Sequence, residues 1–430
     1  MPAGAVADLN RRTGGYVAHR PYWLVWLSVL LACGEAETPP ATFATDAAVA
    51  DTNAVADLGG TADAGALESA SADTTSPTDQ TAAPDAQVAE DTAASPDTAT
   101  APEVPKKPVY TAVAVACGAT PTAGSALAAS PKAYTGGKCP TLVADGKTVN
   151  ALQSKGNARQ FKLIAPADTK PGEKLPVLFA WHWLKGSAKS FIETGELHSA
   201  VAQQRFVAVV PESKGDIEIP LAKASFPWPI TSLSPTARFE EEFVFFDDML
   251  ACVAEQFAID QQCVSVVGVS AGALFGAQLA QARSEHVASF LSLSGGTQSD
   301  GLSNLALLPW KGAKHKMPVL VLWGGPQDSC ALVNFQAASL ALEKGLDKDG
   351  QFQVECIHNC QHGVPPVDAP PGVSKFKALW DFAWSHPYWL PAGHSPWAKG
   401  VPADAPPWCA VGSASAKIRT GECPPPSCPL

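Results

Sequence analysis

The fold is decided by residues 264–283, which read VSVVGVSAGALFGAQLAQAR. The β-branched run Val264–Val267 predicts a short buried strand, and the apolar spacing after it predicts a helix from about 272 to 283. The pentapeptide GVSAG, residues 268–272, stands between them. A serine flanked by glycines at a strand-to-helix turn is the pattern of a nucleophile elbow, in which the glycines let strand and helix approach closely.

Ser270 is therefore the candidate nucleophile. The sharp turn lifts its hydroxyl above the sheet and points the N-terminus of the following helix toward it. In that position the backbone N–H of Ala271 can bind a developing oxyanion. The alternative is a glycine-rich helix start that only packs tightly. The predicted strand before the pentapeptide and the helix after it favour the elbow.

The rest of the body alternates between predicted strands and helices, which is typical of a mostly parallel sheet. Further strands are predicted at Arg159–Ala165, Pro176–Trp183, Arg205–Val210, Ser289–Leu293, Pro318–Trp323 and Phe352–Ile357. Further helices are predicted at 187–204, 240–257, 331–345 and 373–385, and the second of these places Phe243, Phe246, Leu250 and Val253 on one face. We therefore predict an α/β fold with helices on both faces of the sheet.

A serine nucleophile of this kind needs a carboxylate later in the chain, on a loop that follows a strand. The strand predicted at 318–323 is followed by Gly324-Gly325-Pro326-Gln327-Asp328. Asp328 is the one carboxylate in that loop, and we predict that it is the acid. The alternative is that Asp328 caps the helix predicted at 331–345, a position that also suits aspartate.

The base is expected on the loop after the last strand, where His358 and His362 compete. His358 directly continues the strand, whereas His362 lies four residues further on. We predict His362 as the base, because the loop must arch over the top of the sheet to reach Ser270. His358 then becomes a buried or supporting histidine.

These segments resemble the family of bacterial polyhydroxybutyrate depolymerases and feruloyl esterases over roughly residues 155–386. The resemblance is carried by His182-Trp183 at a strand end, by Asp247-Asp248 on a helix, by GVSAG, and by QHGVPP at 361–366. It implies an α/β-hydrolase fold and serine ester hydrolysis by Ser270, Asp328 and His362, with no cofactor and no metal. It also implies that the paired aspartates are structural.

The chain departs from the family pattern where glycines are usual: Trp183 follows His182, and Gln361 precedes His362. The loop at 182–184 supplies the second oxyanion donor in the family. A backbone N–H does not depend on its side chain, so the N–H of Trp183 or Leu184 can still serve. We predict that His182 and Trp228, the latter within SFPWPITS at 225–232, help to form the substrate pocket.

The N-terminus resembles a bacterial lipoprotein signal. A basic start precedes an apolar run at 22–31 that is too short to span a bilayer as a helix. The run ends in Leu30-Leu31-Ala32-Cys33, which resembles a lipobox. We predict a signal peptide over residues 1–32 and lipid attachment at Cys33. The alternatives are an ordinary signal peptide with an incidental cysteine, and a twin-arginine signal at Arg11-Arg12.

Residues 33–108 are predicted to form a disordered Ala/Thr/Asp/Pro linker. Within residues 34–105 there are 14 acidic residues and no Lys or Arg, which accounts for the net charge of −11 of the chain. Such a segment buries too little apolar surface to fold. The near-neutral remainder argues against a nucleic-acid partner. We place the catalytic domain at 109–390 and an irregular Pro- and Cys-rich tail at 391–430.

Eleven cysteines in an exported chain indicate disulfides, up to five if Cys33 carries lipid. Zinc is the rival at Cys356-x3-Cys360, where His358 and His362 stand nearby, but no second ligand pair is evident. Spacing cannot fix connectivity. The possible pairs are Cys330 with Cys360, which would join the acid and base loops, Cys252 with Cys263, and Cys117 with Cys139.

The sequence thus predicts an exported, lipid-anchored serine esterase on a bacterial membrane, at the outer membrane or cell surface. Polyhydroxyalkanoates, feruloyl or acetyl esters of polysaccharides, and small esters all fit as substrates, and the oligomeric state stays open. One alternative is an inactive α/β-hydrolase that acts as a surface binding lipoprotein. Another is a different hydrolase chemistry, such as that of a peptidase or a lipase.

Overall fold

The computed structural model describes residues 108–168, 170–219, 224–298, 306–424 and 428. The signal peptide predicted at 1–32, the predicted lipidation site Cys33 and the linker up to residue 107 lie outside the described residues. Within the described part of the chain, no helix is both long and apolar enough to cross a membrane.

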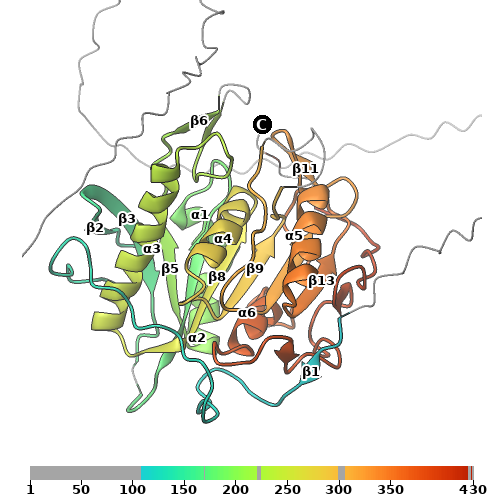
Figure 1. Cartoon of the computed structure of the whole chain (residues 1–430), viewed down its shortest axis with the longest axis horizontal. Coiled ribbons are helices and arrows are strands. Elements are labelled where there is room, and N and C mark those ends of the chain that lie inside the picture. The colour runs from blue at the N-terminus through green and yellow to red at the C-terminus, as the bar shows by residue number, and fades with distance from the viewer. Residues whose placement is uncertain (1–107, 169, 220–223, 299–305, 425–427, 429–430) are drawn as a thin grey trace, which may run out of the picture. The chain divides into compact units, whose positions relative to one another are not determined.

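Nine strands among the described residues form one sheet, in the order β15-β13-β10-β9-β8-β4-β5-β3-β2 (Figure 1). The central run from β5 to β13 is parallel, and β2, β3 and β15 join it antiparallel. The strands are β2 Asn150–Ser154, β3 Asn157–Ile164, β4 Leu175–Trp181, β5 Val207–Pro211, β8 Ile259–Val269, β9 Ser289–Leu293, β10 Val319–Trp323, β13 Gln353–Ile357 and β15 Cys409–Val411.

Three short strand pairs lie outside this sheet. They are β1 Thr111–Ala112 with β14 His394–Ser395, β6 Ile217–Ile219 with β7 Ala224–Phe226, and β11 Ser329–Cys330 with β12 Val333–Asn334. The pair β11–β12 follows the loop that carries Asp328, so it holds the end of that loop as a small hairpin.

The central strands are apolar on both sides because both faces of the sheet are covered. In β4, Phe179 and Trp181 belong to one buried cluster, whereas Leu178 and Ala180 belong to the other. The first cluster is closed by α3 Thr236–Gln256, α4 Ala271–Ala282 and α5 Phe335–Asp349. The second is closed by α1 Ala188–Thr194, α2 Leu197–Gln204 and α6 Lys377–Trp384.

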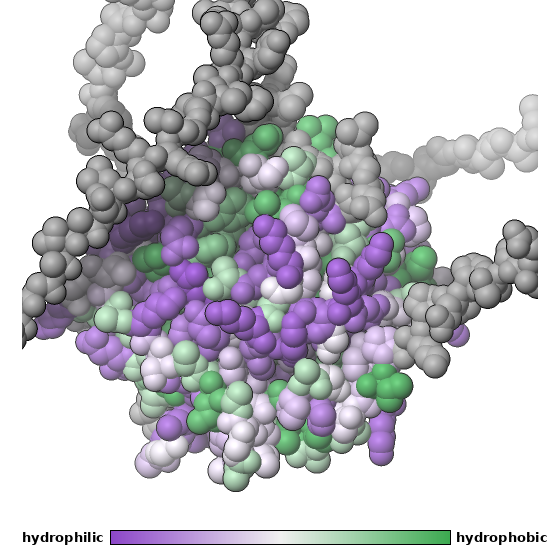
Figure 2. All heavy atoms as spheres, in the orientation of Figure 1, coloured by the Kyte–Doolittle hydropathy of each residue, from purple (hydrophilic) through white to green (hydrophobic). Residues whose placement is uncertain are grey.

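The helix α3 is amphipathic, as predicted. Phe243, Phe246, Leu250 and Val253 of α3 are buried against the sheet. Figure 2 shows hydrophilic side chains gathered in a band over the outer surface of this layer of helices. Local capping fixes the helix ends: the side chain of Asn334 caps α5, and Gly350 in the left-handed conformation ends it.

The structure corrects one sequence-based boundary. The helix predicted at 187–204 is two helices, because the chain turns at Gly195 and Glu196, and Glu196 has a φ of 49°. The tail predicted at 391–430 is joined to the catalytic body. Its strand β15 extends the sheet beside β13, and β14 pairs with β1 near the start of the described chain.

Ten cysteines form five disulfides, so the predicted number is confirmed, but all three suggested pairings are wrong. The pairs are Cys117–Cys263, Cys139–Cys252, Cys330–Cys428, Cys356–Cys409 and Cys360–Cys423. The thiols of Cys356 and Cys360 are consequently not free to bind zinc.

The reason for the wrong pairings is the route of the two terminal segments. Residues 128–142 run across α3, where Thr135 binds Asp248 and Leu142 binds Gln256, and this brings Cys139 to Cys252. Two cysteines of the C-terminal segment form two of the other disulfides: Cys428 bonds to Cys330, and Cys423 bonds to Cys360. Neither route is visible in residue spacing.

Candidate active site

Ser270 stands at the turn between β8 and α4, in a backbone conformation that non-glycine residues rarely adopt, with φ 55° and ψ −121°. Such a residue costs of order 1–3 kcal/mol and persists only where its surroundings hold it. Glycines on both sides make the turn possible. A Cβ at Gly268 would lie 2.2 Å from the carbonyl oxygen of Gly272, and one at Gly272 would lie 2.0 Å from that of Trp181.

The structure brings the three predicted side chains together. Ser270 Oγ lies 2.9 Å from His362 Nε2, and His362 Nδ1 lies 2.7 Å from Asp328 Oδ1. With the Nδ1–H tautomer, the ring donates to the carboxylate and accepts from the serine hydroxyl. All three residues are at least nine-tenths buried, so these hydrogen bonds are little weakened by water.

Asp328 does not cap a helix with its side chain, since the cap of α5 is Asn334. Its second carboxylate oxygen accepts hydrogen bonds from the Ser294 hydroxyl at 2.9 Å and from the Gly324 N–H at 2.7 Å. These donors stabilise the ionised carboxylate and fix its orientation. Ser294 was not predicted. The sequence signal that could have identified it is a hydroxyl residue placed directly after a predicted strand, here β9.

His362 is held from two sides. Its ring stacks on Phe335, with the ring centroids 4.1 Å apart. The preceding Gln361 has a φ of 55° and donates its N–H to the Gly324 carbonyl at 3.0 Å. A Cβ at Gly324 would lie 1.7 Å from the Gln361 carbonyl oxygen, so the acid and base loops touch through their backbones.

His358, the competing candidate, does not contact Ser270. It is fully buried, and its Nδ1 accepts the N–H of Cys360 at 3.1 Å. Burial lowers the pKa of His358 to about 4, so it stays neutral at physiological pH. Its role is to shape the loop on which His362 stands.

The predicted oxyanion groups surround Ser270. Ala271 is the first residue of α4, and a first-turn N–H has no acceptor within its own helix. Trp183 and Leu184 line the same cavity as Ser270. The backbone of residues 181–182 also packs directly against Gly272. The loop after β4 and the elbow therefore meet beside Ser270.

His182 and Trp228 do not line the cavity, which corrects their predicted pocket role. Trp228 is fully buried against Trp181 and Phe275, and its indole N–H donates to the His182 carbonyl at 2.8 Å. His182 is also buried, which lowers its pKa to about 4. His182 is the first residue of the loop at 182–184, and Trp228 lies behind that loop, where the polar end of the indole finds a buried acceptor. Trp228 thus holds the loop from behind.

The cavity in front of Ser270 has a volume of about 380 Å³. None of the side chains that line it carries a fixed charge. Four aromatic side chains contribute to its walls: Trp183, Phe191, Phe376 and Trp380. Pockets of this size and polarity bind uncharged, mainly apolar groups.

The paired aspartates of α3 are structural, as predicted. Asp247 pairs with Arg283 at 2.9 Å and with Lys132 at 3.0 Å. Asp248 accepts the N–H and the hydroxyl of Thr135, both at 2.7 Å. Both carboxylates anchor neighbouring segments to α3.

No protein-family model matches the chain, and no curated protein matches it significantly. Solved structures do. A variant of pOPH in complex with DMSO is 16% identical, with a TM-score of 0.51, and the match covers 66% of this chain and 98% of the other. A pOPH variant in complex with pNPB is 17% identical, with a TM-score of 0.50, and covers 64% and 96%. The chain therefore has the α/β-hydrolase fold.

A weaker similarity is to a ferulic acid esterase, which is 14% identical with a TM-score of 0.40 and covers 50% of this chain and 90% of that one. The order Ser270, Asp328, His362 along the chain is the order of nucleophile, acid and base in this fold. At the level of the fold, the two pOPH structures confirm the resemblance noted from the sequence.

Proposed function

We propose that the chain is a serine ester hydrolase in which Ser270 is the nucleophile, His362 the base and Asp328 the acid. The observation that carries the proposal is the continuous relay from Ser270 Oγ to His362 at 2.9 Å and from His362 to Asp328 at 2.7 Å. Ser270 and His362 line a cavity that is also lined by Trp183 and Leu184 of the predicted oxyanion loop. Nucleophile, base and orienting group within hydrogen-bond reach are the signature of covalent catalysis.

The mechanism follows from these positions. The Ser270 oxygen attacks the ester carbonyl while His362 Nε2 takes the serine proton. Asp328 holds the ring and stabilises the imidazolium, and the N–H groups of Ala271 and of Trp183 or Leu184 bind the oxyanion. The imidazolium then donates its proton to the departing alcohol. Water, activated by the same histidine, hydrolyses the acyl-enzyme and restores the serine.

The substrate that fits best is an uncharged ester with a substantial apolar portion. A charged group placed among the apolar walls of the cavity would lose its hydration without gaining a partner. Polyhydroxyalkanoate, feruloyl and small alkyl esters satisfy this condition. The alternative, an inactive surface-binding lipoprotein, has less support, because binding alone does not require a strained serine in register with a histidine and a carboxylate.

We further propose that the protein is exported and anchored through lipid on Cys33. Five disulfides support an oxidising compartment. Expression in a bacterium fed an alkyne-labelled fatty acid tests the anchor. Label on the native chain and none on a Cys33→Ser variant is the expected result. Equal labelling of both chains, or labelling of neither, contradicts the anchor.

The hydrolase is tested with p-nitrophenyl butyrate. Ser270→Ala is expected to lose all activity above background while unfolding at the same temperature as the native chain. Ser199→Ala, on the outer helix α2, is the matched control and should keep full activity. Native protein without esterase activity, or an active and folded Ser270→Ala variant, contradicts the proposal.

A further inference from the structure

The C-terminal segment is linked to both loops that carry the proposed acid and base. Cys423 bridges to Cys360, two residues before His362, and Cys428 bridges to Cys330, two residues after Asp328. Upstream, β15 pairs with β13, the strand that leads into the histidine loop. The segment that begins at residue 409 thus follows the histidine loop and then reaches the acid loop.

We propose that residues 409–423 are a positioning strap, acting through Arg419, Asn359 and the Cys360–Cys423 bridge, that holds His362 in hydrogen-bonding register with Ser270. The inference rests on the proposed function, and it names residues that touch neither the substrate nor the reacting atoms. Arg419 and Asn359 are positioning residues.

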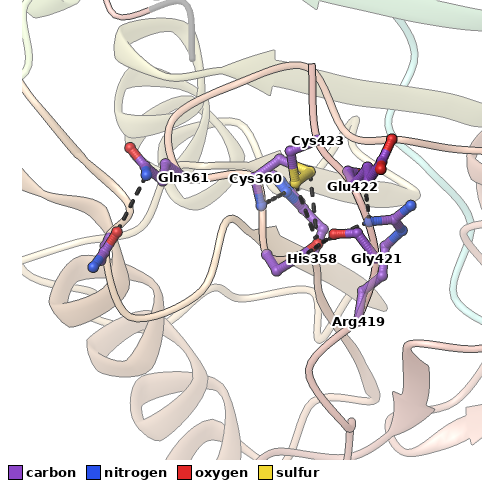
Figure 3. The surroundings of a disulfide bond; sticks show 9 residues. His358, Cys360, Gln361, Arg419, Gly421, Glu422 and Cys423 are labelled. Carbon is purple, nitrogen blue, oxygen red and sulfur yellow. Dashed lines mark hydrogen bonds between the residues drawn. A yellow bond between two sulfur atoms is a disulfide. The ribbon is translucent and has the colours of Figure 1, made fainter. Parts of the chain in front are cut away.

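The contacts between strap and histidine loop are polar and directional (Figure 3). The N–H of Arg419 donates to the carbonyl of Ile357, the last residue of β13, at 2.9 Å. The Arg419 guanidinium donates to Asn359 Oδ1 at 2.9 Å and to the Glu422 carbonyl at 3.1 Å. The amide of Asn359 in turn donates to the Gly421 carbonyl at 2.8 Å.

These contacts close around the disulfide itself. Asn359 Oδ1 lies 3.4 Å from Cys423 Sγ and 3.6 Å from Cys360 Sγ. Cys360 is buried, whereas Cys423 is exposed. The strap therefore binds both the amide oxygen and the amide nitrogen of Asn359, and it is bonded covalently to Cys360.

From there the chain has little freedom before it reaches His362. The N–H of Cys360 is bound by His358, and the N–H of Gln361 is bound by the Gly324 carbonyl. Gln361 sits in the left-handed region, where a non-glycine residue stays only if its neighbours hold it. The loop has no helix or strand of its own at 358–363. External contacts must therefore hold it in place, and the strap supplies those on one side.

The expected effect is on the chemical step. A displacement of about 1 Å in a catalytic group can cost on the order of a hundredfold in rate, even when the altered residue is far from the substrate. None of Asn359, Cys360, Arg419 and Cys423 is among the residues that line the cavity, so substrate affinity should change little. Loss of the strap should consequently lower kcat and leave KM nearly constant.

The experiment compares three changes with matched controls in the full chain. Arg419→Ala and Asn359→Ala leave every disulfide intact, and Cys360→Ser with Cys423→Ser removes the bridge. Arg205→Ala is the control arginine, since Arg205 binds Asp168 and Glu173 ahead of β5, at the amino end of the strands. Cys117→Ser with Cys263→Ser is the control bridge.

The control bridge is a demanding one. It spans 146 residues against 63 for Cys360–Cys423, so in the chain-entropy account its loss should destabilise the protein more. The readouts are kcat and KM on p-nitrophenyl butyrate and the rate constant of fluorophosphonate labelling of Ser270. The labelling rate constant, unlike its extent, does not depend on any fraction of the protein that is irreversibly unfolded.

Each strap variant should lower kcat and the labelling rate constant by about tenfold or more with KM within about twofold, consistent with a small displacement of the base. Arg419→Lys, which keeps a donor for Asn359, should recover part of the loss. Both controls should keep native rate constants. Native rate constants in Arg419→Ala and Asn359→Ala, or equal losses in the control bridge, overturn the strap. Failure of the native chain to react at all overturns the proposed function instead.

Discussion

Gly272 on α4 leaves no room for a side chain against the carbonyl oxygen of Trp181 at the end of β4, where a Cβ would lie 2.0 Å away. Strand β4 is the neighbour of β8, the strand that leads to Ser270, and Trp181 lies opposite Gly268 in their register. The elbow and the oxyanion loop are therefore assembled by one backbone contact. The geometry around Ser270 depends on that contact as much as on the triad side chains.

Gly272→Ala should consequently disrupt both folding and activity. A backbone clash cannot be relieved by a rotamer change, so we expect a loss of about 1–3 kcal/mol in the free energy of unfolding. Hydrolysis should be largely lost. Gly276→Ala on the same helix is the control, because its nearest neighbour is the ring edge of Phe290 at 2.9 Å. Urea unfolding and esterase assays measure both, and a Gly272→Ala variant as stable and active as the control would refute this.

Ser294→Ala should lower kcat by about tenfold. The hydroxyl donates to Asp328 Oδ2 at 2.9 Å, and a hydrogen bond to a charged group contributes about 1.5–3 kcal/mol. The variant should lose only part of this stabilisation in the transition state, because the Gly324 N–H still donates to Asp328 Oδ2. The matched control is Ser292→Ala, since that buried hydroxyl of β9 has no hydrogen-bond partner in the described structure. Equal kcat values for the two variants contradict the role given to Ser294.

Trp183→Ala should shift substrate preference toward larger esters. The indole lies over Gly186, where a Cβ would come within 3.1 Å of the ring, and it packs near Phe191, so it is a fixed wall of the cavity. Its removal leaves the backbone N–H in place. We expect the ratio of kcat/KM for naphthyl over methyl esters to rise by roughly tenfold, within the range usual for pocket contacts. Trp183→Phe serves as the control. An unchanged ratio in Trp183→Ala would show that the Trp183 side chain does not limit the size of the substrate.

Glu343 should contribute a fall in the stability of the protein as pH rises from about 5 to 9. Burial and the neighbouring Glu355 raise the pKa of Glu343 from 4.5 to about 9. Between these values the folded state keeps a proton that the unfolded state releases. The free energy of unfolding therefore decreases with rising pH, by at most about 1.4 kcal/mol per pH unit for one proton, and levels off above the folded value.

Glu343→Gln tests this pH dependence, because an amide stays neutral throughout. Urea unfolding between pH 5 and 9 measures the free energy of unfolding as a function of pH. The slope of this free energy against pH should be less negative for the variant than for the native chain. The contact of Glu343 with Trp323 Nε1 at 3.4 Å can be kept by the amide oxygen. If the slope is the same in both proteins, another group is responsible.

Much of the site could be predicted from the sequence because each of its three side chains follows a strand with a strong local pattern. GVSAG and the loop at 324–328 each stand directly after an apolar run, and the segment QHGV follows one after three further residues. In a parallel sheet the carboxyl ends of such strands meet at one edge. Pattern and chain order were therefore enough to identify Ser270, Asp328 and His362.

The rest depends on contacts that local patterns do not encode. Ser294 reaches Asp328 only because β9 and β10 are neighbours in a particular register. Trp228 lies behind the oxyanion loop rather than in the pocket because its N–H needs the His182 carbonyl. The disulfide pairs follow from the paths of the terminal segments across the body. Each of these is a long-range relationship, and residue type alone left it open.

The most direct test of the central claim is the intact mass of the native protein after reaction with a fluorophosphonate, followed by peptide mapping. We expect a single adduct, located on Ser270 in the peptide that contains GVSAG, and its absence in His362→Ala on the same time scale. No adduct on the folded native protein, or an adduct on a different residue, would show that Ser270 is not the nucleophile.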